Sequence, residues 1–492
     1  MKRLAVTFAL ACVGLAFVGP AQAGLTVGVA DDHALGTADH GAAFFTLMND
    51  VGLSEMRLSV NWDITQPTTI MHQEQIESVL PVATLRGVRV IFSIRPLQAR
   101  SITETPAASD GFVSFLEHVA RTFPTVDNVI VGNEPNQSRF WQPQFGPTGT
   151  GASGAAFEAL LARSYDRLKS VDPTINVIGV GLSPRGGDNA RASSNISTSP
   201  VKFLQGMGAA YRASGRTKPL MDEFAYHPYP KKDTDSLTEG YSWPNAGVTN
   251  LNRIKQAFWD AFSDTGQKTF EDGLQVKLDE VGWQVAVPAA LPPYFGAESI
   301  VPTTEAAQAA IYPALLRYVA CDPAVEAVLF FGLQDEPNLD RWQAGLMRAD
   351  GSARPSYASV RAEIAETGGN CPDRMRVWHH STTVEGAKAT FPKLRRLPRR
   401  VHKWSILARA DEDAFFTAGI YRVTRGRTRL KAKTLTNSGR LTAFRTRFVR
   451  FPSKRLRPGK YVYSIRIRAE ASAKRSTRLT SRKFVVFAPR HR

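Results

Sequence analysis

The chain has 492 residues, 43% of them hydrophobic and 22% charged, and a formal net charge of +18 at neutral pH. This length exceeds one ordinary hydrophobic core, so we expect two or three domains, and the composition excludes a disordered chain. The charge is unevenly divided: residues 372–492 hold 33 Lys or Arg and 6 Asp or Glu, a net +27, whereas the preceding residues are near −9. The sequence therefore joins two parts of different character.

The first 23 residues, MKRLAVTFALACVGLAFVGPAQA, place Lys2 and Arg3 before an apolar run that ends in the small-residue motif AQA. This pattern is typical of a secretory signal cleaved after Ala23. The alternative, a membrane anchor, needs a longer apolar run than this one. We therefore predict a secreted protein, extracellular or associated with the cell wall, without a membrane span after cleavage.

Two cysteines, Cys321 and Cys371, would remain in the mature chain, because Cys12 lies in the signal. In an oxidising compartment such a pair can form one disulfide. Cysteines in CxxC spacing are absent from the sequence, which argues against a structural zinc site.

From residue 24 to about 370, a short β-branched run, a loop and an amphipathic stretch recur eight times. The expected strands are residues 25–30, 55–62, 88–96, 128–134, 176–184, 221–229, 275–283 and 327–335. The expected helices are residues 40–52, 73–86, 109–123, 154–171, 199–214, 250–265, 303–320 and 355–366. This alternation predicts an α/β fold, a (β/α)8 or TIM barrel over residues 24–370, because parallel strands need helical crossovers. An open doubly wound sheet is the alternative, disfavoured because no glycine-rich phosphate loop follows the first strand.

After the barrel the pattern changes. Residues 371–400 are interpreted as a linker, since glycines and prolines interrupt any regular pattern there. Residues 401–492 alternate apolar with basic residues, as in KYVYSIRIRAE, which predicts a small basic all-β sandwich with one cationic face. Such a face serves solubility, or adhesion to an anionic cell-wall polymer or acidic polysaccharide. Nucleic acid is not expected as a partner, because no nucleic-acid-reading motif accompanies the charge.

Carboxylates lie at the ends of two expected barrel strands, where functional side chains of this fold gather. The run NVIVGNEPNQ ends its apolar stretch at Asn133 and Glu134, and a proline then stops strand pairing, which places Glu134 at the rim. The seventh strand ends at the neighbours Asp279 and Glu280, of which one should face the barrel and the other the helices. Strands four and seven face each other across part of the mouth, which can bring Glu134 and Glu280 together.

An isolated glutamate at a strand end can instead cap a helix or pair with a surface lysine. Rival carboxylates are also present. Glu223 precedes the exit of the sixth strand, and Asp335 with Glu336 lies at or beyond the end of the eighth, so none of the three is the preferred catalytic group.

Three motifs in order resemble the retaining glycoside hydrolases of the large (β/α)8-barrel clan that includes cellulases, mannanases and β-xylosidases. NEP at residues 133–135 is similar to the clan's Asn-Glu-Pro signature after strand four, and DEVGW at residues 279–283 to its strand-seven signature, usually Thr-Glu-x-Gly-Trp. HPY at residues 227–229 matches the strand-six His-x-Tyr, and Arg57 matches the strand-two arginine. The resemblance covers residues 24 to about 368 and leaves out the basic tail.

The resemblance implies that Glu134 is the acid/base and that Glu280, rather than Asp279, is the nucleophile. Retention of anomeric configuration requires two such carboxyl groups about 5 Å apart. A neighbouring cation such as Arg57 would keep Glu280 ionised, and Tyr229 could donate a hydrogen bond to it.

The remaining predicted site residues bind the sugar or support the carboxylates. Asn133 is expected to bind the 2-hydroxyl of the reacting sugar, and His227 to hold the surrounding side chains in place. Trp283 and Trp141 are expected to stack on sugar rings. At strand eight, where the clan commonly presents a tryptophan, this sequence offers Phe330, Phe331 and Leu333, which makes a typical cellulase the least expected member.

We therefore predict a secreted retaining glycoside hydrolase that cleaves β-glycosidic bonds of an oligo- or polysaccharide and needs no metal or organic cofactor. The alternative from another class is a non-catalytic carbohydrate- or cell-wall-binding protein on a barrel scaffold. Transglycosylation is a third option, since it shares the first chemical step and differs only in what attacks the intermediate.

Overall fold

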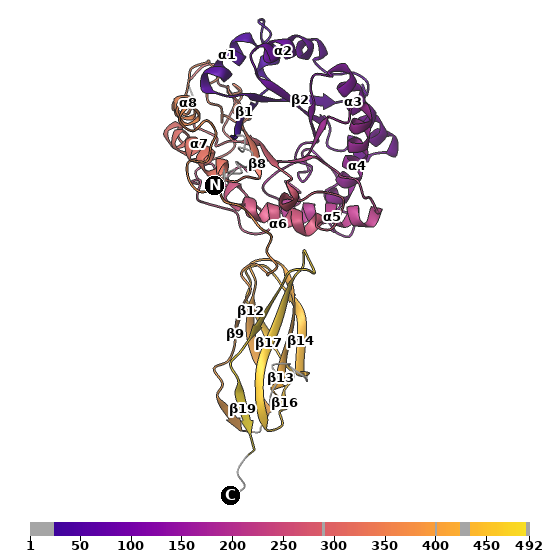
Figure 1. The fold of residues 1–492 in the computed structure, drawn as a ribbon, viewed down its shortest axis with the longest axis vertical. Helices are drawn as coiled ribbons and strands as arrows, with labels where there is room; N and C mark the ends of the chain where they lie inside the picture. Colours follow the sequence, from indigo (N-terminus) through magenta and orange to yellow (C-terminus); the bar gives the residue numbers. More distant parts are fainter. Residues whose placement is uncertain (1–23, 288–290, 399–400, 424–432, 489–492) are drawn as a thin grey trace, which may run out of the picture.

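The structure is a computed structural model that describes residues 24–287, 291–398, 401–423 and 433–488. Figure 1 shows two parts, a ring of strands enclosed by helices and an elongated all-β domain that extends away from it. The predicted signal peptide, residues 1–23, lies outside the described residues. Within the described ranges, no helix is long and apolar enough to cross a membrane.

Eight parallel strands form a closed barrel, in which each strand pairs with the next and β1 pairs with β8. The strands are β1 (Thr26–Ala30), β2 (Glu55–Trp62), β3 (Arg89–Pro96), β4 (Asn128–Val131), β5 (Asn176–Leu182), β6 (Glu223–Tyr226), β7 (Val276–Val281) and β8 (Val325–Phe331). The helices are α1 (Ala42–Val51), α2 (Gln73–Leu85), α3 (Pro106–Thr122), α4 (Ser153–Val171), α5 (Pro200–Ser214), α6 (Leu251–Phe262), α7 (Glu305–Ala320) and α8 (Pro355–Thr367). The predicted (β/α)8 barrel is confirmed.

Alternation of side chains along each strand divides the barrel into layers. On β2, Met56, Leu58 and Val60 belong to the large core between sheet and helices. A separate apolar layer fills the barrel interior, made by Ile91, Ile130, Ile178, Ala225, Ala327 and Leu329. This layer separates a charged cluster at the amino ends of the strands from the polar groups at their carboxyl ends.

The charged cluster surrounds Lys277, which is fully buried near the start of β7. Its Nζ lies 2.7 Å from Oε1 of Glu55, 2.5 Å from Oε2 of Glu326 and 3.8 Å from Oε1 of Glu223. Glu223 begins β6, so it lies at the opposite end of the barrel from the predicted active site. Glu223 therefore belongs to this cluster and not to the mouth of the barrel.

We expect this cluster to make stability depend on pH through Glu223. Burial raises the pKa of Glu223 to about 7, even though Lys277 lowers it. Because the folded chain holds this proton more tightly than the unfolded chain, the stabilisation is complete below pH ~4.3 and is lost as pH rises through the folded pKa. The glutamine of Glu223→Gln does not titrate, so this variant escapes the loss of stability that the parent suffers as pH rises. Its free energy of unfolding, measured with urea and taken relative to that of the parent, should therefore increase by about 2 kcal/mol between pH 5 and pH 8.

Glu326→Gln provides the matched control, because folding shifts the pKa of Glu326 in the direction opposite to that of Glu223. Burial opposes ionisation of Glu326, but Lys277 and Arg89 hold its pKa below the usual value. Its stabilisation is therefore present above the unfolded pKa and is lost as pH falls. This variant should be less stable than the parent at pH 8, with the difference shrinking toward pH 4, and equal pH slopes for the two variants would contradict the assignment.

The C-terminal domain packs two main sheets around its own apolar core, which confirms an all-β domain. The larger sheet has the order β10-β19-β17-β13-β14, with β18 also paired to β17, and the facing sheet has the order β15-β12-β9. The strands are β9 (Lys388–Thr390), β10 (Arg396–Pro398), β11 (Val401–His402), β12 (Ser405–Arg409), β13 (Ala414–Val423), β14 (Lys433–Leu441), β15 (Arg447–Arg450), β16 (Lys454–Arg455), β17 (Gly459–Ala469), β18 (Ser476–Thr480) and β19 (Phe484–Phe487). Because β9 and β10 pair with strands of this domain, the predicted linker over residues 371–400 is too long.

Buried charges connect the two domains. Arg475, in the turn between β17 and β18, lies with Nη2 2.8 Å from Oδ2 of Asp260 on α6 and 2.6 Å from Oε2 of Glu412. The ring of His380 stacks on Trp259 of α6, with ring centres 4.0 Å apart. These contacts hold the C-terminal domain against one side of the barrel.

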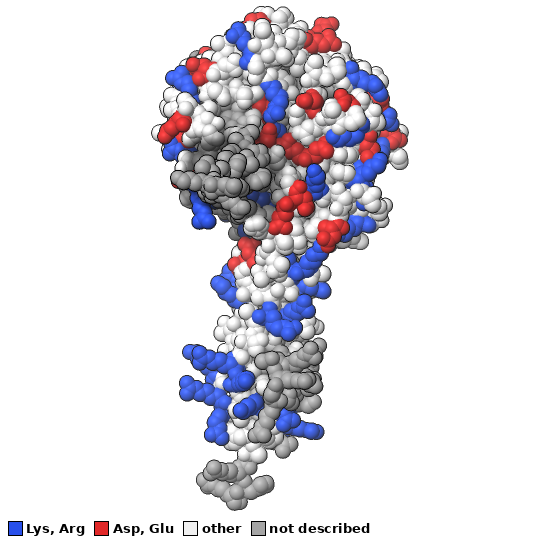
Figure 2. Space-filling model, viewed as in Figure 1, with Lys and Arg blue, Asp and Glu red and all other residues white. Residues whose placement is uncertain are grey.

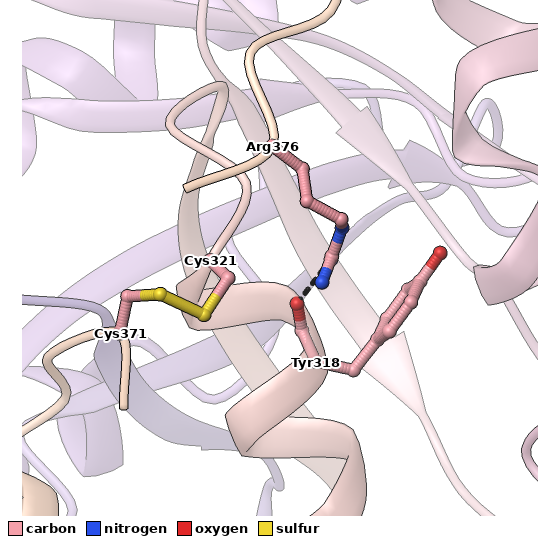
Figure 3. Close-up of a disulfide and its surroundings, with 4 residues drawn as sticks. All are labelled: Tyr318, Cys321, Cys371 and Arg376. Atoms are coloured by element: carbon pink, nitrogen blue, oxygen red, sulfur yellow. Dashed lines mark hydrogen bonds between the residues drawn. A yellow bond between two sulfur atoms is a disulfide. The ribbon is translucent and has the colours of Figure 1, made fainter. Parts of the chain in front are cut away.

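A disulfide joins Cys321, directly after α7, to Cys371, with the two Cα atoms 4.6 Å apart. Figure 3 shows the bond beside Arg376, whose backbone N–H donates to the Cys321 carbonyl at 2.7 Å. The Arg376 guanidinium donates to the carbonyl of Tyr318 and lies 3.9 Å from the centre of its ring. The two cysteines of the mature chain therefore form the disulfide that the sequence analysis allowed, at the point where the chain leaves the barrel.

Candidate active site

Glu134 is presented by a strained turn after β4. The strand ends at Val131, three residues earlier than the sequence predicts. The φ of Glu134 is 40°, in the left-handed region that is rare for non-glycine residues and further disfavoured before a proline. Its backbone N–H donates to the carbonyl of Gly181 on β5 at 2.8 Å, which fixes the turn. Strain of this kind concentrates at functional sites.

One imidazole nitrogen lies close to both predicted catalytic carboxylates. Nδ1 of His227 is 3.1 Å from Oε1 of Glu134 and 3.5 Å from Oε2 of Glu280. The distance between the Glu134 oxygen and the Glu280 oxygen therefore cannot exceed the sum of these two distances. That limit is compatible with the ~5 Å separation of retaining glycosidases and lies below nearly all of the ~6.5–9.5 Å range of inverting ones. The barrel thus brings the two glutamates together.

His227 is completely buried and lies directly after β6. Burial opposes the charge, but Asp279 and Glu280 outweigh it and raise the pKa of His227 to about 10. Both ring nitrogens therefore donate near neutral pH, and Nε2 lies 3.1 Å from Oδ2 of Asp279. A Cβ on Gly181 would lie 3.3 Å from this nitrogen, so the glycine lets the β5 backbone approach the ring closely.

Asp279 and Glu280 both point to the site, contrary to the expectation that one faces the helices. Between Leu278 and Val281, β7 has two residues where β8 has one, which is a β-bulge. A bulge interrupts the alternation of side chains and re-aims them. Arg57 of β2 binds both acids, with Nε 3.1 Å from Oδ2 of Asp279 and Nη1 2.8 Å from Oε1 of Glu280.

The other predicted polar residues complete one hydrogen-bonded network. Tyr229 donates its hydroxyl to Oε2 of Glu280 at 3.0 Å, and Nη2 of Arg57 donates to Oδ1 of Asn133 at 2.6 Å. Burial, reinforced by Glu280, raises the pKa of Tyr229 well above its usual value, so the phenol remains a donor. Burial opposes the charge on Asp279, but His227 and Arg57 hold its pKa below the usual range. All six predicted polar residues therefore meet at the mouth of the barrel.

Trp283 and Trp141, which the sequence analysis predicts to stack on sugar rings, are both buried in the structure. Trp283 is 1% exposed and donates its indole N–H to the carbonyl of Asp235 at 3.0 Å. Trp141 is 2% exposed and packs edge-to-face on Phe157 in the core. Neither ring has a face open to a sugar, because the loops that carry them fold back over the barrel core. The prediction that they stack on substrate is wrong for this structure.

Trp342 supplies an accessible aromatic ring that the sequence analysis missed. It lies in the long segment between β8 and α8 and is only partly buried. Its ring centre is 4.2 Å from that of Tyr229 and 6.1 Å from that of Phe331, the last residue of β8. Trp342 therefore lies beside the end of strand eight, although it comes from the following loop, which no motif marked.

A buried ion pair holds the segment that carries Trp342. Arg354 donates to both carboxylate oxygens of Asp335, at 2.9 and 2.6 Å, and Asp335 also accepts from Tyr294 and from the Gly345 backbone. This rival carboxylate is therefore a clamp on the loop, while Glu336 beside it is exposed. Across the described part of the chain, no group of three or more His, Cys, Asp or Glu side chains could hold a metal ion.

Comparisons with known proteins give no sequence match. No protein-family model matches the chain, and the search of curated proteins finds none that matches. Solved structures do match, at low identity. A family 39 glycoside hydrolase from Bacteroides cellulosilyticus is 16% identical with a TM-score of 0.47, over 87% of this chain and 81% of that one.

Two further matches have similar values. A β-xylosidase from Caulobacter crescentus is 16% identical with a TM-score of 0.46, over 82% of this chain and 83% of that one. An endo-1,4-β-mannanase from Rhizomucor miehei is 14% identical with a TM-score of 0.45, over 70% of this chain and 94% of that one.

Proposed function

We propose that this protein is a secreted β-glycoside hydrolase that retains anomeric configuration, with Glu280 as nucleophile and Glu134 as acid/base. The observation that carries the proposal is the position of His227, whose Nδ1 lies within 3.5 Å of a carboxylate oxygen of each glutamate. Two carboxyl groups this close suit attack on a sugar carbon by one and protonation of the leaving oxygen by the other.

In the first step, a carboxylate oxygen of Glu280 forms a bond to the anomeric carbon while the bond from that carbon to the departing oxygen breaks. Glu134 transfers its proton to the departing oxygen. Arg57 and Tyr229 orient the attacking carboxylate, because each binds one of its two oxygens. The amide of Asn133, held by Arg57, is placed to bind the 2-hydroxyl as the oxocarbenium-like transition state forms.

In the second step, water attacks the glycosyl ester and Glu134 accepts its proton, so the ester oxygen returns to Glu280 as a carboxylate. His227 holds Glu134 and Asp279 in position through both steps, because one of its ring nitrogens lies 3.1 Å from a carboxylate oxygen of each. Transglycosylation differs only in that a sugar hydroxyl replaces the water.

The alternative is a carbohydrate- or wall-binding protein that has kept the barrel without activity. Against it stands the intact network, in which Glu280 receives contacts from Arg57, Tyr229 and His227. A binding protein has no need for a strained Glu134 opposite such a carboxylate.

A panel of aryl β-glycosides, including xylosides, mannosides, glucosides and glucuronides, tests the proposal. At least one should be hydrolysed by the parent and not by Glu280→Gln, and proton NMR of the fresh reaction should show the β-anomer as the first product. First release of the α-anomer would overturn the retaining mechanism. Hydrolysis of none of the panel, with binding of a polysaccharide retained, would favour the binding protein.

Trp342 is expected to be a platform for the reacting sugar, since its ring packs beside Tyr229 at the site. Trp342→Ala should raise KM roughly tenfold, because stacking of a sugar on an aromatic face is lost, while kcat falls less. Trp342→Phe should recover most of the loss. Trp141→Phe is the contrasting variant: its ring is buried, so its KM should stay near that of the parent.

A further inference from the structure

The outer face of the C-terminal sheet presents arginines that form no ion pair with a carboxylate of the described residues. Along β17, Ile465 and Ile467 point into the domain core, whereas the alternating residues Arg466 and Arg468 are exposed. On β13, Phe416 is likewise buried and Phe415 is 40% exposed. Figure 2 shows Lys and Arg spread over this domain, with acidic side chains gathered near its junction with the barrel.

Strand register sets these side chains in two rows across the sheet. In one row Phe415 lies between Arg440 and Arg468, and the Arg468 guanidinium lies 5.8 Å from the centre of the Phe415 ring. In the next row Arg466 lies directly opposite Arg478 of β18. Rows on one face of a strand are ~7 Å apart and neighbouring strands ~4.8 Å apart, so these cations form one compact patch.

The patch lacks the carboxylates that neutralise the cations around it. Arg440 at its edge binds Glu470 and Asp413, and Arg475 in the turn before β18 binds Asp260 and Glu412. For Arg466, Arg468 and Arg478, by contrast, no ion pair with a carboxylate is formed within the described residues, and Arg466 donates only to the neutral hydroxyl of Ser476. Like charges directly opposite on neighbouring strands destabilise a sheet. A solvated face that served only solubility would not require this pairing.

We propose that this face, formed by Arg466, Arg468, Arg478 and Phe415, binds a linear anionic polysaccharide. The spaced guanidinium groups fit carboxylate or sulfate groups repeated along a chain, and the exposed phenyl ring beside them on β13 fits the apolar face of a sugar. The choice of a polysaccharide over a nucleic acid rests on the proposed glycosidase function. The face would then hold the barrel near glycan that it cleaves.

Binding is tested with the full-length Glu280→Gln protein, so that no polymer is cut, against polygalacturonate, heparin, neutral xylan and a DNA duplex. Polygalacturonate or heparin should bind with an affinity that falls as salt rises, whereas xylan should not bind at this face. Adding Arg466→Ser and Arg478→Ser should weaken binding roughly five- to tenfold, since two exposed cations that pair with the polymer are lost and exposed ion pairs are individually weak.

The matched control removes the same charge elsewhere, with Arg445→Ser and Arg450→Ser on the turn and strand of the facing sheet. This pair should change binding less than twofold. Equal effects of the two pairs, or tighter binding of the DNA than of both anionic glycans, would overturn the proposal. Hydrolysis of aryl glycosides by Arg466→Ser/Arg478→Ser in the parent background should be unchanged, so failure of the binding face is distinguishable from failure of the enzyme.

Discussion

Glu280→Gln should lower kcat/KM on a reactive aryl β-glycoside by roughly 10⁴- to 10⁶-fold. The amide is uncharged and cannot form the glycosyl ester, although it fills the same space beside Arg57 and Tyr229. Circular dichroism and urea unfolding would check that the variant stays folded. Initial rates at several substrate concentrations measure the loss.

A smaller variant identifies the nucleophile independently of that loss. Glu280→Ala leaves a space in which azide can attack the anomeric carbon directly, so azide should restore turnover and give the α-glycosyl azide from a β-substrate. Asp279→Ala is the matched control on the same bulge, and azide should not rescue it. If azide rescued Asp279→Ala and not Glu280→Ala, the nucleophile would be the neighbouring residue.

Glu134→Ala should give a loss that depends on the leaving group. For a poor leaving group such as methanol, the expected fall in kcat/KM is roughly 10²- to 10⁴-fold, because the departing alkoxide no longer receives a proton. For dinitrophenolate, which leaves without a proton, the first step should be nearly normal and the glycosyl-enzyme should accumulate. A burst of dinitrophenol in stopped-flow absorbance would report this.

Azide again gives the decisive product for Glu134. It attacks the accumulated intermediate without a general base, so turnover should recover and yield the β-glycosyl azide, opposite in configuration to the product from Glu280→Ala. A loss of equal size for methyl and dinitrophenyl glycosides would contradict the acid/base role of Glu134.

The barrel was predictable because its strands are buried on both faces and its helices are amphipathic, which leaves a strong alternating pattern. The polar site residues were predictable because they follow strand ends in short motifs, as in the NEP and HPY runs. Their common location follows from closure of the ring alone, since carboxyl ends of parallel strands meet at one rim.

What remained unpredictable depends on tertiary packing. Asp279 points inward because of a β-bulge. A bulge is defined by the pairing of two strands, and the register of that pairing cannot be read from the sequence of one strand. The burial of Trp141 and Trp283 and the exposure of Trp342 depend on how loops fold over the mouth. The start of the second domain was placed too late because β9 and β10 are only three residues each.

The bond between Cys321 and Cys371 determines how a pulling force on the second domain would reach the barrel. Drag on a polymer held by the second domain would pull on the backbone where it leaves the barrel. Without the sulfur bridge, that force would peel away α8, the last helix to close the ring. If the second domain holds a polymer as proposed, the bridge transmits the load to the end of α7, so the barrel keeps its shape under tension.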